Sequence, residues 1–216
     1  MPNASIMLRE RDLFVASHQF WVLCVGDEPI SELNGMATDR DTNETKMIGS
    51  NNDLLKVWEY NTDGRESSLG RYSISDTGLY QPNQFCTIKL SGDFETIIKP
   101  RWECAIQAAK KINEQQIQYH VVASYRQDAF LNAFNIFMNA NAAVIASDDQ
   151  DLSVGNSNSV ARTLGEVMGF DPINISGRLV SGQEKNLLPK EIYPDLYEYS
   201  DSFLRNSSIP RNLCCI

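Results

Sequence analysis

Two stretches near the N-terminus predict a β-hairpin, and they constrain the fold more than any other feature of the chain. Residues 12–25 (DLFVASHQFWVLCV) are rich in the β-branched and aromatic side chains that favour strands. Residues 30–37 (ISELNGMA) predict a second strand, and the intervening Gly26-Asp27-Glu28-Pro29 is typical of a turn. We therefore expect these two strands to lie side by side and antiparallel.

Helices are predicted in the second half of the chain. Apolar residues recur at helical spacing over 91–115 and over 126–141. An amphipathic helix is predicted over 158–168, and Gly169 stands at its C-cap position.

Strands and helices are therefore largely segregated along the sequence. Shorter strands are predicted at 54–60 and 117–123. This order indicates an α+β fold. We expect one domain over 1–216, with a core at about 4–170 and a turn-rich C-terminal extension at 171–216.

The composition supports a packed core and argues against nucleic acid as a partner. With 42% hydrophobic and 22% charged residues among 216, the chain is not intrinsically disordered as a whole. Affinity for nucleic acid depends on Lys and Arg that neutralise phosphates, but 19 basic residues face 28 acidic ones and the net charge is −9. We expect no nucleic-acid partner.

The N-terminal residues predict neither a signal peptide nor a membrane span. Residues 1–10 (MPNASIMLRE) lack the apolar core of a signal peptide, and no apolar run approaches the ~18 residues that cross a bilayer. We expect synthesis in the cytoplasm without a signal peptide, so export would need a specialised secretion system.

No metal or cofactor site is predicted. The five cysteines are odd in number and lack C-x-x-C spacing, which fits neither a closed disulfide framework nor a tetrahedral metal site: Cys24, Cys86, Cys104, Cys214 and Cys215. The run Asp39-x-Asp41-x-Asn43 is spaced like the start of a calcium loop. It has Glu44 where such loops need glycine and Ser50 where they need a bidentate glutamate. We expect no cofactor.

Imidazole chemistry in this chain must use His18 or His120, because these are its two histidines. Strand alternation places His18 on the same apolar face as Phe20 and Val22. A half-buried core histidine is the plain alternative for both residues.

The segment Gly155-Asn156-Ser157-Asn158-Ser159 directly precedes the amphipathic helix. Ser and Asn at this position are ordinary N-cap residues. The alternative is a nucleophile at a helix N-terminus, where backbone N–H groups and the helix dipole stabilise a developing oxyanion. An α/β-hydrolase is disfavoured, because its histidine follows the serine in the chain and both histidines here precede it.

Two patches resemble a known family. SHQFWVLCVGDEPISELNGMATDRDT (17–42) and VGNSNSVARTLGEVMG (154–169) resemble circularly permuted papain-like hydrolases of the NlpC type, which occur in bacterial toxin modules and in type VI secretion hydrolase effectors. In that permuted order a strand histidine comes first and the nucleophile comes last, at the start of a helix. The resemblance implies a papain-like antiparallel sheet packed on helices.

The resemblance also implies roles for individual residues. His18 would be the general base, the position of Ser157 would hold the nucleophile, and a polar residue on the next strand would orient the imidazole. Asn34 is the best candidate for this third residue and Asp39 the second. Asn34 shares a face with His18 only if the hairpin connection is odd in length or a bulge interrupts the strand.

Backbone N–H groups near Asn158 and Ser159 would then form the oxyanion hole. The departure from the family pattern is Ser157, because papain-like enzymes use cysteine there. A hydroxyl stays protonated at a helix start and needs a working base, whereas a thiol gains from a lowered pKa. Cys104, near the start of a predicted helix, is the rival nucleophile, and a small apolar filler is its plain alternative.

The expected function is hydrolysis of amide bonds in peptidoglycan peptides by a secreted antibacterial effector that acts in a target-cell periplasm. An immunity protein and a secretion-apparatus carrier would then be partners. A first alternative is a lipid acyl hydrolase or acyltransferase, favoured if Phe130, Phe134 and Phe137 line an apolar channel. A second is a catalytically inactive binding module whose polar 61–83 loop contacts a partner.

Overall fold

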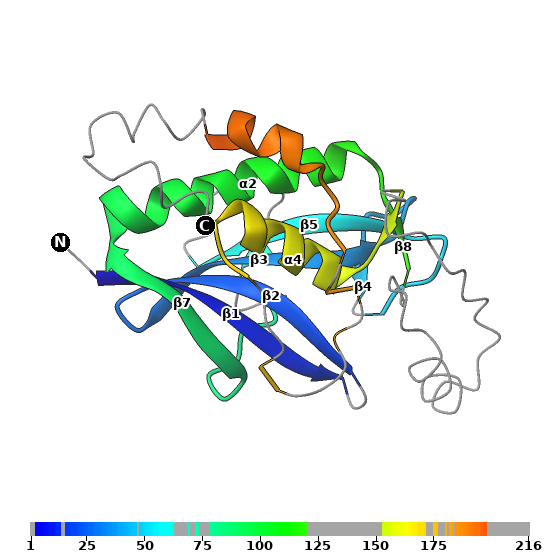
Figure 1. The fold of residues 1–216 in the computed structure, drawn as a ribbon. Helices are drawn as coiled ribbons and strands as arrows, with labels where there is room; N and C mark the ends of the chain where they lie inside the picture. The colour runs from blue at the N-terminus through cyan, green and yellow to red at the C-terminus, as the bar shows by residue number, and fades with distance from the viewer. Residues whose placement is uncertain are drawn as a thin grey trace.

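The computed structural model of the chain shows a curled β-sheet with helices against one of its faces (Figure 1). It describes residues 3–13, 16–46, 48–62, 69, 72–73, 78–120, 153–171, 175–176, 180, 182–183 and 185–197. The strands are β1 (Asn3–Leu13), β2 (Ala16–Val25), β3 (Glu28–Thr38), β4 (Thr45–Lys46), β5 (Leu54–Asn61), β6 (Tyr72–Ser73), β7 (Phe85–Asp93), β8 (Gln118–Tyr119) and β9 (Val154–Gly155). The helices are η1 (Phe94–Ile98, a π-helix), α2 (Lys99–Glu114), α4 (Ser157–Val167) and η2 (Lys190–Ile192, a 3₁₀ helix).

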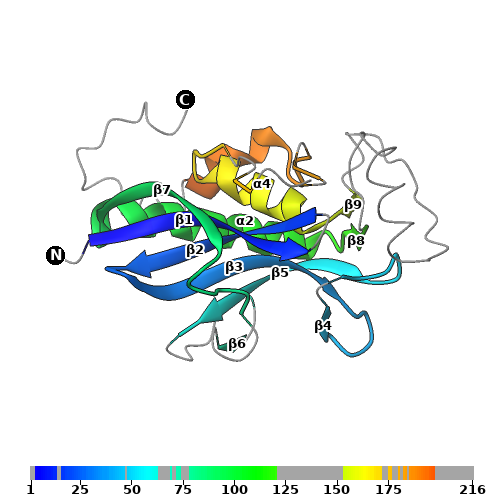
Figure 2. The same cartoon turned by 90° about the horizontal axis from the view of Figure 1, so that it is seen from below.

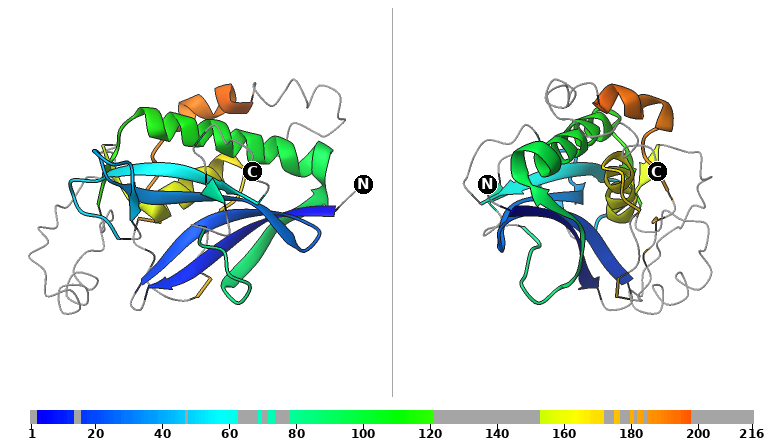
Figure 3. Two further views of the ribbon diagram at one scale, coloured as in Figure 1. Left: turned by 180° about the vertical axis from the view of Figure 1, so that it is seen from behind. Right: turned by 60° about the vertical axis from the view of Figure 1, so that its left-hand side comes forward.

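The sheet has the order β7-β1-β2-β3-β5-β8-β9, with β4 added to β3 and β6 added to β5. The long strands all pair antiparallel, and the short pairs β5–β6 and β8–β9 are parallel. Helices α2 and α4 lie on the same face of this sheet (Figure 2), which curls around α4 (Figure 3). The expected α+β class is confirmed at this level.

The main core lies between the sheet and the two helices. Alternate residues of the long strands, among them Leu8, Trp21 and Leu33, are buried against apolar side chains of α2 and α4. A smaller apolar cluster occupies the opposite face of the sheet and contains Phe20, Val22, Cys24, Met36 and Leu79. The two faces follow from the strand period of two.

The predicted hairpin is confirmed, and it contains a bulge. β2 and β3 pair antiparallel, and the register shifts between Leu23 and Cys24, since Leu23 pairs with Ser31 while Cys24 pairs with Pro29. Ile30 is therefore the extra residue on β3. Because Pro29 has no N–H to donate, an interrupted ladder here loses little.

The expectation of one strand over 12–25 is wrong at its start. Residues up to Leu13 belong to a separate strand, β1. It pairs antiparallel with β2, and Leu13 with Ala16 is the pair next to the turn between them. The charged run Arg9-Glu10-Arg11-Asp12 hides the strand character of β1 in the sequence, although Ala4, Ile6 and Leu8 alternate into the core.

The helix predicted over 91–115 begins later than expected. β7 extends to Asp93, whose carboxylate then accepts the Thr96 N–H and caps the π-helix η1. The α-helix proper, α2, starts at Lys99 with Pro100 in its first turn, where a missing N–H costs nothing. The edge strand β7 was not predicted.

Several other expectations are confirmed. The strand at 54–60 is β5, and the helix at 158–168 is α4, followed by Gly169 with a φ of 80°. Of the predicted strand at 117–123, Gln118–Tyr119 forms β8, Ile117 and His120 lie outside the strand, and 121–123 lie outside the described residues. The predicted helix at 126–141 also lies outside them.

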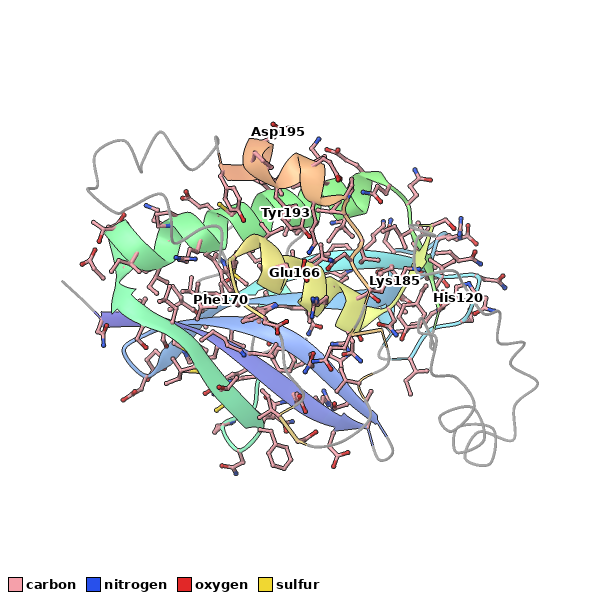
Figure 4. All side chains as sticks on the ribbon, in the orientation of Figure 1. His120, Glu166, Phe170, Lys185, Tyr193 and Asp195 are labelled. Atoms are coloured by element: carbon pink, nitrogen blue, oxygen red, sulfur yellow. The ribbon has the colours of Figure 1, made fainter. Side chains whose placement is uncertain are left out.

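Described residues of the C-terminal extension return along α4 (Figure 4). The Leu187 N–H donates to Thr163 Oγ1 at 2.8 Å, and Asn186 Nδ2 donates to Glu166 Oε2 at 2.8 Å. Tyr193 and Leu196 are buried in the main core. Within the described residues, no helix is long and apolar enough to cross a membrane.

The hydrogen-bond ladder between β2 and β3 stops before either strand ends. Its last pair is Trp21 with Leu33. β2 nevertheless continues back to Ala16 while paired with β1, and β3 continues to Thr38 while paired with β5. We call this separation, between residues 16–20 and 34–38, the fork.

The N-terminal turn of α4 meets β3 at the fork, and Gly35 makes this approach possible. A Cβ added at Gly35 would lie 2.7 Å from Val160 Cβ and 3.1 Å from Ser157 Cα. A side chain at this position would therefore push α4 away from the sheet.

We expect Gly35→Ala to lower the free energy of unfolding by about 2–3 kcal/mol, because its Cβ overpacks the contact with α4. Urea denaturation measures this loss. Combining it with Val160→Ala should recover a small part of the loss, because that change removes the Cγ2 methyl, also 2.7 Å away, but keeps the clashing Cβ. Gly26→Ala is the control: nothing lies within 4 Å of its added Cβ, so only the positive φ of 60° costs, about 1 kcal/mol. Equal losses at Gly26 and Gly35 would contradict the close approach.

Candidate functional site

The structure joins His18 and Asn34 across the fork. His18 Nε2 lies 2.5 Å from Asn34 Oδ1, and the two side chains are 2% and 0% exposed. The bulge after Pro29 puts them on one face of the sheet, together with Phe20, whose ring centroid is 6.2 Å from that of His18. The bulge therefore meets the condition stated above for His18 and Asn34 to share a face of the sheet.

Glu32 lies behind this pair on the same face of β3. Asn34 Nδ2 donates to Glu32 Oε1 at 2.7 Å. The other donors to this carboxylate are the backbone N–H groups of Leu79, at 2.9 and 3.1 Å, and of Tyr80, at 2.9 Å. Burial raises the pKa of Glu32, and the three donors oppose that rise.

Asn158, in the first turn of α4, takes the place of a strand partner for β2. The Gln19 N–H donates to Asn158 Oδ1 at 2.8 Å, and Asn158 Nδ2 donates to the Ser17 carbonyl at 3.0 Å. These backbone groups flank His18 and face the side of β2 from which β3 has separated. The side chain of Asn158 thus fixes the start of α4 beside His18.

Ser157 is brought to the fork by its neighbour Asn158 and by the contact of its Cα with Gly35. It is 6% exposed. Among the described residues, no hydrogen bond joins Ser157 to His18, whose imidazole bonds Asn34. The structure therefore brings the first turn of α4 to the fork, but the side chains of His18 and Asn34 lie on the face of the sheet opposite to Gly35 and α4, and the proton-transfer bond is not made.

The N-cap of α4 is Asn156, which confirms the ordinary capping role predicted for this segment. Its Oδ1 accepts from the N–H groups of Asn158 and Ser159 at 3.0 and 3.1 Å. These are the two groups expected to form an oxyanion hole, and they are already satisfied. In the described part of the chain, the N–H of Ser157 makes no such bond.

Burial lowers the pKa of His18 from 6.5 to about 4, and the nearby charge of Arg11 adds to this effect. The hydrogen bond that His18 Nε2 donates to Asn34 Oδ1 acts in the opposite direction. His18 is consequently neutral at pH 7 and has a free lone pair to accept a proton. It is also a weak base, because the imidazolium would form in a buried place.

The rival residues lie elsewhere. The carboxylate of Asp39 bonds Lys46 Nζ at 2.9 Å, so Asn34 and not Asp39 contacts His18. Cys104 is buried in the main core on α2, and its Sγ lies 3.7 Å from the Leu196 carbonyl, as expected for an apolar filler. His120 is buried next to β8, where its backbone N–H donates to the Gly155 carbonyl at 2.8 Å.

A polar pocket of about 580 Å³ lies at the segment that is spaced like a calcium loop, and Asp39, Lys46 and Asp53 are among the residues that line it. Lys46 Nζ lies between two carboxylates of this pocket, 2.9 Å from Asp39 Oδ2 and 2.7 Å from Asp53 Oδ1. Its bond to Asp39 holds the pKa of that carboxyl well below the usual range. The ammonium group thus neutralises these carboxylates. Nowhere in the described ranges do three or more His, Cys, Asp or Glu residues gather as metal ligands.

Sequence reasoning missed the contributions of Glu32 and of the Asn158 side chain. Glu32 carried a signal, because a charged residue stood two positions before Asn34 and on the same face of a predicted strand. Asn158 carried none, since its partners in β2 are 139 and 141 residues away.

No family model, no curated protein sequence and no solved structure matches this chain.

The burial of His18 predicts a pH-dependent stability. Unfolded His18 binds its proton near pH 6.5, while the folded state resists protonation down to about pH 4. The unfolded state then binds more protons in this window, so stability falls as the pH drops from 6.5 to 4, by up to about 3 kcal/mol. Denaturant titrations of wild type and His18→Gln across this range measure the effect as a difference. Parallel pH profiles would contradict it.

Asn158→Ala should remove both hydrogen-bond partners of the β2 backbone at the fork and cost about 2–4 kcal/mol, because two buried groups lose their hydrogen bonds. Asn113→Ala is a matched control. Asn113 makes the same pair of bonds to Val57 N and O, at 2.7 and 2.9 Å, but in a half-buried place that water can reach. We expect about 1 kcal/mol there. Equal losses by chemical denaturation would show that Asn158 has no special role.

Proposed function

We propose that this chain is a papain-like hydrolase of the permuted NlpC type that cleaves amide bonds in peptidoglycan peptides. The observation that carries the proposal is the buried His18–Asn34 hydrogen bond beside the first turn of α4, which holds Ser157. A histidine oriented by an amide and a nucleophile at a helix start are the parts that this chemistry needs. The residue order His18, Asn34, Ser157 is the permuted one.

In the proposed reaction, His18 accepts the proton of Ser157 Oγ while that oxygen attacks the carbonyl carbon of the scissile amide. The protonated imidazole then gives the proton to the leaving amine, and water releases the acyl group by the same steps. The N–H of Ser157 is better suited to the oxyanion than those of Asn158 and Ser159, which bond Asn156. Binding of substrate must also bring Ser157 and His18 into hydrogen-bond contact.

The biological setting that we propose is that of an antibacterial effector, exported by a specialised secretion system to a target-cell periplasm and neutralised in its producer by an immunity protein. Its support is the resemblance of the two patches to toxin modules, which is an argument from similarity. The apolar channel that would favour lipid substrates involves residues 130–137, which lie outside the described residues.

A second function, that of a catalytically inactive binding module, is favoured by three observations on Ser157. Ser157 replaces the usual cysteine, is nearly buried, and makes no hydrogen bond to His18 in the described structure. The same fold would then present its surface to a partner without turnover.

Digestion of purified peptidoglycan, followed by chromatography and mass spectrometry, tests the proposal. We expect new muropeptides from wild type and a loss of at least about 10³-fold in rate for His18→Ala and Ser157→Ala, because both remove a member of the reacting pair. Cys104→Ala is the control that should retain activity. Full activity of His18→Ala would refute the mechanism. Absence of products from wild type and from Ser157→Cys, with binding to intact sacculi, would favour the binding module.

A further inference from the structure

We propose that Glu32 sets the tautomer of His18 by acting through Asn34, which makes Glu32 a positioning residue of the site. The tautomer itself is a property of the folded chain. Its use in proton transfer rests on the proposed function.

The contacts of Glu32 define a fixed direction of hydrogen bonding. Its carboxylate is 0% exposed, and its three donors are neutral N–H groups, from Leu79, Tyr80 and Asn34. An ionised carboxylate accepts hydrogen bonds and donates none. The amide of Asn34 must therefore turn its Nδ2 toward Glu32 and its Oδ1 toward His18.

The orientation of the Asn34 amide determines which nitrogen of the His18 imidazole carries the hydrogen. Because Asn34 Oδ1 is an acceptor, the short contact of 2.5 Å requires a hydrogen on His18 Nε2. A neutral imidazole carries one hydrogen, so Nδ1 is left with its lone pair. Nδ1 is then the nitrogen that can accept a proton, and the Nε2–H stays bound to Asn34.

A purely structural role does not require a carboxylate at position 32. The amide oxygen of a glutamine would accept the N–H groups of Leu79 and Tyr80 equally well. Burying a carboxylate among neutral donors is costly compared with burying an amide. What glutamine cannot do is hold Asn34 in this orientation, because its own NH₂ would face Asn34 Nδ2 and the Asn34 amide would turn over.

Two variants test this inference: one reverses the direction of the hydrogen bonds from Glu32 to His18, and the other restores it. In Glu32→Gln, Asn34 should flip and present Nδ2 to His18, which moves the ring hydrogen to Nδ1. In the double variant Glu32→Gln/Asn34→Asp, the introduced glutamine donates to the introduced carboxylate, which again accepts from Nε2–H. The double variant keeps the net charge of wild type, so the repair does not depend on total charge.

Long-range ¹H–¹⁵N correlation spectra at pH 7 report the tautomer directly, and two histidines give a simple spectrum. We expect Nε2–H in wild type, Nδ1–H in Glu32→Gln and Nε2–H again in the double variant, with His120 unchanged. His18→Gln identifies the His18 signals. An Nε2–H tautomer in folded Glu32→Gln would overturn the inference. If that variant does not fold, wild type decides, because an Nδ1–H tautomer there would overturn it equally.

The peptidoglycan digest supplies a second readout. Glu32→Gln should lose at least about 100-fold in rate, and the double variant should recover at least tenfold of that loss. A structural role alone would give no recovery, since the double variant carries two substitutions. If wild type proves inactive, the proposed function fails. The spectra still decide the tautomer independently of activity.

Discussion

The separation of β2 from β3 is the constraint on which the rest of the site depends. A continuous ladder would have paired Ser17 and Gln19 with β3 and left no place for a helix end. Because the ladder stops at Trp21 and Leu33, these backbone groups need other partners, and Asn158 provides them. The satisfaction of buried backbone groups thus fixes where α4 begins, and with it the position of Ser157.

Elements with a clear hydrophobic period were predictable from the sequence. The amphipathic stripe of α4 and its glycine C-cap, the strand at β5, and the hairpin all depend on local patterns that no distant contact overrides. β1 was missed because its C-terminal half carries the charged run Arg9-Glu10-Arg11-Asp12, of which Arg9 and Glu10 are buried, and this run conceals an alternating strand. β7 was missed because an edge strand has few buried side chains to mark it.

The candidate site was predictable in its residues and not in its connections. His18 stood out because histidines are scarce, and Asn34 because it was polar on a predicted strand. Whether they meet depends on one extra residue, Ile30, which reverses the face of everything beyond it. The roles of Asn156 and Glu32 follow from hydrogen-bond geometry, for which sequence spacing alone gives no measure.

The long sequence separation between Asn158 and β2 has a consequence for the order in which the chain matures. During synthesis, β1, β2 and β3 leave the ribosome well before α4, because 139 residues separate Gln19 from Asn158. Until α4 arrives, the backbone of β2 at the fork lacks its partner Asn158 and remains solvated. The nascent chain therefore carries His18, Asn34 and Glu32 before the helix that closes the fork, and β2 gains the hydrogen bonds to Asn158 only when α4 has been made.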